Sequence, residues 1–167
     1  FHAGPTALNL AIPANDGKAE VVSEITFGEN AKLVYAQPHM HLRGKDFELR
    51  VVTPDGQSQT VLKGNWNFEW QMGYQYAEPI ALPKGSKLRL ISHFDNSKAN
   101  RFNPDPESKV VWGPQNWDEM SNCFIGVLFD RNTSPQKVFL RSGPSLLPRA
   151  EYGPTLAAFE GAGANAV

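Results

Sequence analysis

The chain is predicted to be an all-β protein, an antiparallel β-sandwich or jelly roll. Apolar and polar residues alternate over short segments, and no long segment repeats its apolar residues at the 3.6-residue period of a helix. Glycine and proline are frequent, 14 and 13 among 167 residues, and they separate the alternating segments. Short strands joined by such turns are typical of sandwiches and jelly rolls.

The first clear strand is predicted over residues 32–42. Alternation divides it into two faces, one with both histidines and one with Met40, which is therefore expected to point into the core. The face of the histidines consists of Leu33, Tyr35, Gln37, His39 and His41. The opposite face consists of Val34, Ala36, Pro38, Met40 and Leu42.

A hairpin is predicted next. Phe47, Leu49 and Val51 alternate in a strand that ends at the turn 53–56, where a proline presets φ and a glycine accepts positive φ. The return strand contains Val61 and Leu62. Large apolar side chains then occupy every second position from 66 to 74, and we interpret them as core, with a stacking platform for a sugar or base as the alternative. They are Trp66, Phe68, Trp70, Met72 and Tyr74.

The second half begins with a turn at 82–85 and a strand over 87–94, in which His93 has the opposite parity to the apolar residues. The polar loop 95–117 is long, so it is expected to be functional or packed by its own side chains. Residues 123–129 are apolar at both parities, as in a central strand, and Cys123 is interpreted as a small buried hydrophobe.

Two parts are predicted, a β-sandwich or jelly-roll domain over 1–141 and an extended Pro/Gly/Ala-rich tail over 142–167. The tail has little to pack and is expected to be mobile or to lie on a partner. Because the first residue is Phe1, we expect a processed or truncated chain, or part of a longer one.

The charges and the apolar stretches exclude two classes of partner. Lys and Arg number 16 against 17 Asp and Glu, so no net field attracts nucleic acid or an anionic membrane surface. The longest apolar stretch, 123–129, is far shorter than the roughly 20 residues of a membrane helix, so no direct membrane span is expected.

Three side chains are candidate metal ligands: His39, His41 and Met120. In a strand the two histidines point to one side with Cα atoms roughly 6.5 to 7 Å apart, so both imidazoles can reach one ion. Met120 lies in the polar segment 118–122, where it is either packed into the core or placed as a ligand. Two imidazoles and one thioether suit copper better than zinc or magnesium.

Together these segments resemble the C-terminal catalytic domain of the copper type II, ascorbate-dependent monooxygenases, the family that includes peptidylglycine α-hydroxylating monooxygenase. The resemblance covers roughly residues 11–130 and rests on His39-Met-His41, followed much later by Asp-Glu-Met-Ser-Asn at 118–122 and an apolar strand. The sequences at 39–44 and 93–97 are most similar to bacterial members.

The resemblance implies an eight-stranded antiparallel jelly roll with one copper per chain, bound by His39, His41 and Met120 at the place where oxygen is activated. It also implies C–H hydroxylation with ascorbate as the electron source. A periplasmic or extracellular location is expected. Candidate residues beside the ligands are His93, Gln37 and Asn122.

Some of these residues have other interpretations. His93 is a fourth ligand, a residue that orients a metal histidine, or a loop anchor bonded to Asp95, and we favour a structural role. Asp118 and Glu119 are a catalytic carboxylate pair or, as we favour, provide capping or loop hydrogen bonds.

The chain also departs from the family. Only His2 precedes the pair, so the second, three-histidine copper site of the full enzymes is missing from this chain. Gln37 stands where the peptide enzymes have the arginine that holds the substrate carboxylate, and Phe124 stands where they have a tyrosine. Ser121 replaces a disulfide cysteine of the animal enzymes. Copper binding is compatible with all of these departures, whereas hydroxylation by this chain alone is not expected.

Two functions of different classes follow. The first is an oxidoreductase module, the oxygen-activating half of a copper monooxygenase that acts on a small molecule with a partner domain carrying a second redox centre. The second is a non-catalytic jelly-roll subunit, with or without copper, that docks onto a larger redox assembly. Copper storage or delivery is a third possibility, without a second thioether cluster to support it.

Overall fold

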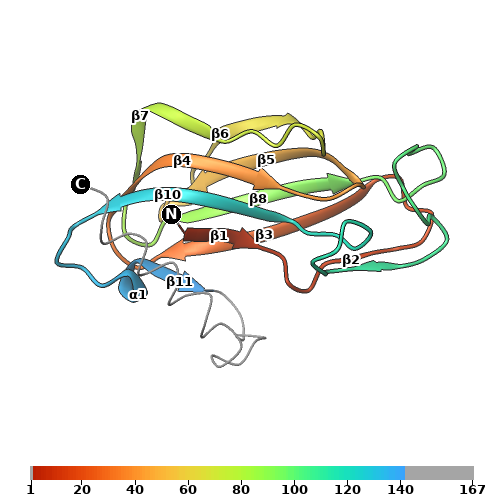
Figure 1. Cartoon of the computed structure of the whole chain (residues 1–167). Coiled ribbons are helices and arrows are strands. Elements are labelled where there is room, and N and C mark those ends of the chain that lie inside the picture. The colour runs from red at the N-terminus through yellow and green to blue at the C-terminus, as the bar shows by residue number, and fades with distance from the viewer. Residues whose placement is uncertain (1, 142–167) are drawn as a thin grey trace, which may run out of the picture.

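The computed structural model describes residues 2–141, which form two antiparallel sheets packed as a β-sandwich (Figure 1). The first sheet has four strands in the order β1-β10-β4-β7. These strands are β1 (His2–Thr6), β10 (Asn122–Phe129), β4 (Ala31–His39) and β7 (Tyr74–Leu82). The predicted all-β class is confirmed, while the jelly-roll connectivity stays a prediction.

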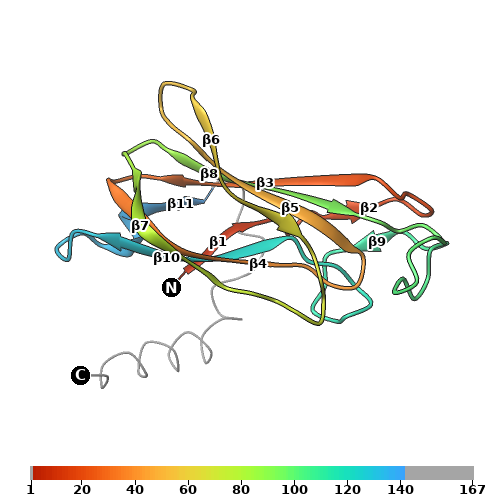
Figure 2. The same cartoon turned by 90° about the horizontal axis from the view of Figure 1, so that it is seen from above.

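The second sheet has five strands in the order β11-β3-β8-β5-β6. These strands are β11 (Phe139–Arg141), β3 (Ala19–Phe27), β8 (Lys87–Phe94), β5 (Gly44–Val52) and β6 (Ser58–Asn65). Seen from above, β3 and β8 lie in one layer while β4 and β10 lie in the other (Figure 2). The remaining elements are the short pair β2 (Ala11–Ile12) and β9 (Val110–Val111), and one turn of helix, α1 (Pro135–Val138).

Alternate side chains of the strands point between the two sheets and form the core. In β8, Leu88, Leu90 and Phe94 are fully buried, while Arg89 and His93 lie on the outer face. This is the predicted alternation of residues 87–94. The predicted strand 47–51 is also confirmed, since its three apolar side chains in β5 are buried.

The predicted face of the histidines is wrong at Leu33. The ladder between β4 and β7 is irregular between Leu33 and Tyr35, and the ladder between β4 and β10 is irregular at 126–127. A bulge adds one residue to a strand and exchanges its two faces beyond that point. Leu33 is therefore buried on the same side as Met40, which is 1 % exposed and confirmed as core.

The core interpretation of the stripe at 66–74 is wrong. Residues 66–73 form a loop between β6 and β7, so no ladder holds them in period-two alternation. Trp66 alone of the stripe's aromatic residues packs against the core. Trp70, Met72 and Tyr74 are exposed by 69 %, 45 % and 38 %.

The predicted central strand at 123–129 is β10, which lies between β1 and β4. Cys123 is a free, buried thiol as expected, and burial raises its pKa to about 12. The apolar side chains of the other face are not covered, since Phe124 is 43 % exposed and Leu128 is 55 % exposed. The position between two strands is as predicted, while the outer apolar face is exposed because the second sheet covers only the other face.

The long loop at 95–117 is packed by its own side chains, one of the two expected alternatives. Asn96 is fully buried, and its Nδ2 donates to the carbonyl oxygens of Pro13 at 2.8 Å and Ser108 at 3.0 Å. Its Oδ1 accepts from Asn103 Nδ2 at 3.0 Å and from Arg43 Nε at 2.9 Å. The loop is thereby fixed beside the segment that follows β4.

The predicted tail at 142–167 lies outside the described residues. Within residues 2–141, no helix has the length and apolarity that a membrane span requires.

The imidazole of His93 lies between two carboxylates on the outer face of the five-stranded sheet. Its Nδ1 is 2.5 Å from Asp46 Oδ1, and its Nε2 is 3.3 Å from Glu20 Oε2. The favoured structural role therefore fits, with Asp46 and Glu20 as partners in place of Asp95. The hydrogen bond with Asp46 raises the pKa of His93.

Replacing this histidine, as in His93→Gln, is expected to destabilise the protein in a pH-dependent way. The pKa is raised in the folded state, so the stabilisation is fully present below the ordinary pKa of 6.5 and is lost as the pH rises through the folded pKa. Urea midpoints of both proteins from about pH 5.5 to about pH 9 should show the largest difference at low pH. A difference that grows with pH would contradict the assignment, and Asp46→Asn should reduce the dependence, leaving the smaller contribution of Glu20.

Candidate metal site

The two histidines of the pair lie together where β4 ends. His39 is the last residue of the strand, and His41 follows it beyond the core side chain of Met40. The centroids of the two rings are 5.1 Å apart, with the ring planes at 82°. The two imidazoles are therefore close together, as the period of a strand predicts.

The ring of His39 is oriented by the loop between β6 and β7. His39 Nδ1 is 2.7 Å from Gln71 Oε1, and the amide nitrogen of Gln71 donates to the carbonyl of Phe68 at 3.0 Å. This second bond places the amide oxygen of Gln71 against the imidazole. Because that oxygen only accepts, Nδ1 carries the proton, and the lone pair of Nε2 is left for a ligand.

His41 is 3 % exposed, and its Nδ1 is buried without a hydrogen-bond partner among the described residues. Burial lowers the pKa of His41, and the neighbouring ring of His39 lowers it further. Both effects favour the neutral imidazole, the form that binds metal ions. A buried nitrogen without a partner costs roughly 1–3 kcal/mol, which a bound ion would offset.

Met120 comes to the pair from a distant part of the sequence. Asn122, two residues later, is the partner of His39 in the ladder between β10 and β4. The side-chain amide of Asn122 donates to Met120 Sδ at 3.3 Å, while its Oδ1 is buried without a partner among the described residues. The thioether is thus held by the side chain of a residue that pairs with His39.

The carboxylate of Glu119 connects these two segments. It is fully buried and accepts hydrogen bonds from the backbone N–H groups of His41, Arg43 and Met120. Burial raises the pKa of Glu119 to about 7, although these donors and the Arg43 charge act in the opposite direction. The favoured prediction of loop hydrogen bonds is confirmed for Glu119.

Arg43 was not identified by sequence analysis, although it is one of the largest fully buried side chains. Its Nη1 donates to the carbonyl of Trp117 at 2.8 Å, and its Nη2 lies 3.4 Å from the carbonyl of Asp105. An arginine two residues after His41 carries no signal of burial in the sequence. Its partners belong to the loop 95–117, and the alternation of the sequence does not predict how that loop packs.

Aromatic rings surround His39. Trp66 and Phe124 have centroids 6.2 Å and 6.4 Å from the imidazole, and Trp66 Nε1 donates to the carbonyl of His41 at 3.0 Å. Gly44 permits this packing, because a Cβ there would lie 2.5 Å from the Trp66 ring. The imidazole pair therefore borders an apolar surface that is partly open to solvent.

Gln37 and His93, the other two candidates for a place beside the ligands, lie on different sheets. Gln37 is on β4, and its Oε1 accepts from the hydroxyl of Tyr35 at 3.0 Å. His93 belongs to the other sheet, where both ring nitrogens face carboxylates.

The candidate donors are two imidazoles, which lie together, and one thioether from the segment that pairs with the end of β4. Within residues 2–141, no group of three or more His, Cys, Asp or Glu side chains is arranged to hold a metal ion. An N₂S set suits copper, whose reduced form prefers soft ligands, and suits zinc and magnesium poorly. The residues present therefore fit copper in their chemistry.

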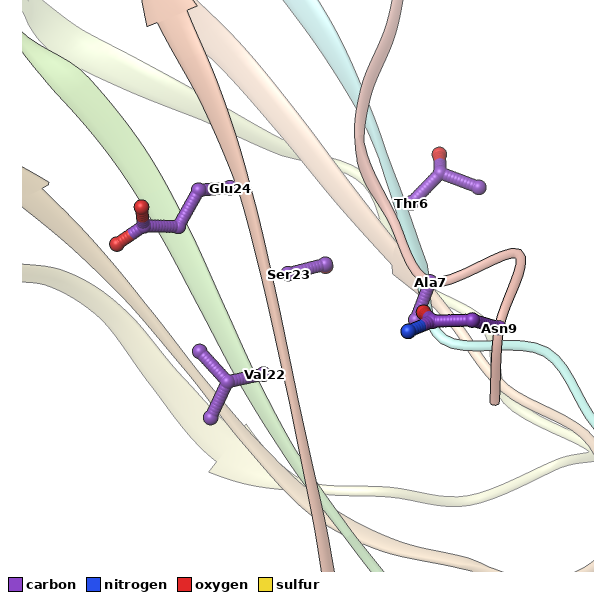
Figure 3. A pocket seen from close by; sticks show the side chains of 6 residues that line it. All are labelled: Thr6, Ala7, Asn9, Val22, Ser23 and Glu24. Atoms are coloured by element: carbon purple, nitrogen blue, oxygen red, sulfur yellow. The ribbon is translucent and has the colours of Figure 1, made fainter. Parts of the chain in front are cut away.

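A hollow of about 370 Å³ lies elsewhere, between the segment that follows β1 and the strand β3 (Figure 3). Its lining residues are Thr6, Ala7, Asn9, Val22, Ser23 and Glu24. None of them is a histidine, cysteine or methionine, and the carboxylate of Glu24 is paired with Lys87 and Arg89. The hollow is therefore not a second candidate for the metal.

In comparisons with known proteins, the chain matches no protein-family model and no curated protein.

Proposed function

We propose that this domain binds one copper ion through His39, His41 and Met120. The observation that carries the proposal is the meeting of two segments far apart in the sequence, through the pairing of Asn122 with His39 and the bonds of Glu119. The neutral, buried imidazole of His41 and the oriented ring of His39 add the features expected of metal ligands.

The proposed activity is that of an oxygen-activating module of a copper monooxygenase, located in the periplasm or outside the cell. Bound copper would supply one-electron and oxygen chemistry for hydroxylation of a C–H bond. The chain's own residues would hold and orient that centre: Gln71 fixes the proton on His39 Nδ1, and Trp66 with Phe124 borders it with apolar surface. A partner domain or chain with a second redox centre would deliver electrons.

The second candidate is a non-catalytic subunit of a larger redox assembly. The exposed apolar side chains on the outer face of β10, Phe124 and Leu128, favour a docking surface on that side. This function needs neither turnover nor a substrate. The two candidates differ in whether copper is required.

Titration with Cu(I) against a chromogenic chelator tests the proposal. The wild-type chain is expected to bind one equivalent, and His39→Ala with His41→Ala should abolish that binding. The matched control is His93→Ala, which removes a histidine on the other sheet and should leave the stoichiometry at one. Wild-type protein that binds no copper, or copper uptake that survives loss of both histidines, would contradict the proposal and leave the docking function.

A further inference from the structure

The backbone of Glu119 is anchored beside the short strand β9. Its N–H donates to the carbonyl of Val111 at 3.3 Å, and its carbonyl accepts from the N–H of Gly113 at 3.2 Å. Between these bonds lies an isolated bridge to Trp112. The side chain thus extends from a fixed point of the fold toward the segment that follows β4.

One carboxylate serves three amides there. Glu119 Oε2 accepts from His41 N at 2.8 Å and from Met120 N at 3.1 Å, while Oε1 accepts from Arg43 N at 2.6 Å. These donors are main-chain groups, so the bonds fix the backbone positions of His41 and Met120 rather than their ring or sulfur orientation. The same oxygen therefore joins the main chains of two of the three proposed ligands.

We propose that Glu119 is a positioning residue for the metal site, one that sets the separation of His41 and Met120 so that imidazole and thioether bind the same ion. This inference rests on the proposed copper function. Outer partners that orient metal ligands typically change metal affinity by about 10- to 100-fold when they are removed. The hydrogen bonds of Glu119 act on the backbone, so their loss should affect the sulfur ligand most, since Met120 comes from the distant segment.

Glutamine is the informative replacement at this position. Its side chain has the size of glutamate but presents one acceptor oxygen and one NH₂ donor. Whichever way the amide turns, the NH₂ group faces a backbone N–H that formerly donated. Glu119→Gln therefore removes either the hydrogen bond from Arg43 N or the two hydrogen bonds from His41 N and Met120 N, and it leaves no cavity.

The first measurement is Cu(I) affinity, combined with copper K-edge X-ray absorption, on wild type and Glu119→Gln. We expect the variant to bind Cu(I) about 10- to 100-fold more weakly, with the sulfur scatterer reduced and the imidazole scatterers retained. The matched control is Glu48→Gln, which removes a carboxylate paired with Arg50 on the outer face of β5 and should change neither quantity. A Glu119→Gln variant with wild-type affinity and an unchanged sulfur shell would overturn the positioning role.

A second measurement needs no variant, in case Glu119→Gln does not fold. Hydrogen exchange of the amides of His41, Arg43 and Met120 in the wild-type protein should be as slow as exchange within β4, because each is bonded to a buried acceptor. Exchange at the rate of open loops would overturn the proposal. Failure of the proposed function is distinguishable, because wild type itself would then bind no copper.

Discussion

Arg43→Ala is expected to lower the free energy of unfolding by about 3 to 5 kcal/mol. Arg43 is 2 % exposed, and its charge lies near the fully buried carboxylate of Glu119. Alanine removes the opposing charge and leaves the carbonyls of Trp117 and Asp105 without the donor they have in the folded chain. Removing one partner of a buried set of charges costs more than the interaction itself contributed, because the remaining charge stays away from water.

Urea unfolding of wild type and Arg43→Ala measures this loss. The matched control is Arg50→Ala, because the guanidinium of Arg50 is paired with Glu48 at the surface, where ion pairs contribute little. A loss at position 43 no larger than the loss at position 50 would show that the buried charges do not hold the 39–43 segment to the loop.

Met120→Leu is expected to weaken Cu(I) binding by more than about 100-fold, beyond the range found for outer partners of metal ligands. Leucine keeps the size and apolar character of methionine but has no sulfur. A thioether favours Cu(I) over Cu(II), so the loss of affinity should be larger for Cu(I).

Competition titrations of both oxidation states check this expectation. The matched control is Met72→Leu, because Met72 is 45 % exposed on the neighbouring loop and should leave both affinities unchanged. Equal losses for Cu(I) and Cu(II) in Met120→Leu, or none, would exclude a sulfur ligand at this position.

The fold class was accessible from the sequence because strand alternation is local. The alternation of Leu88, Leu90 and Phe94 survives in β8, and Met40 is buried as its parity predicts. The errors come from interruptions of that period. The bulge beside Leu33 exchanges the faces of β4, and the loop 66–73 carries a period-two stripe without any ladder partner. Neither interruption leaves a signal in a single sequence.

Part of the candidate site follows from local periodicity, and the rest depends on tertiary packing. Proximity of His39 and His41 follows from two-residue spacing in an extended chain, but the approach of Met120 depends on pairing between β4 and β10 and was expected only from a resemblance. The roles of Glu119 and Arg43 depend on the packing of the long loop. Hydrogen bonds between distant segments are set by tertiary structure, which local periodicity does not encode.

The proposed copper site is tested by the copper K-edge X-ray absorption spectrum of the wild-type chain loaded with one equivalent of Cu(I), beside that of Met120→Leu. Wild type is expected to show two imidazole scatterers and one sulfur scatterer, and the sulfur scatterer should be absent in Met120→Leu. A wild-type spectrum without sulfur, or a sulfur shell that persists in the variant, would contradict a copper site at His39, His41 and Met120.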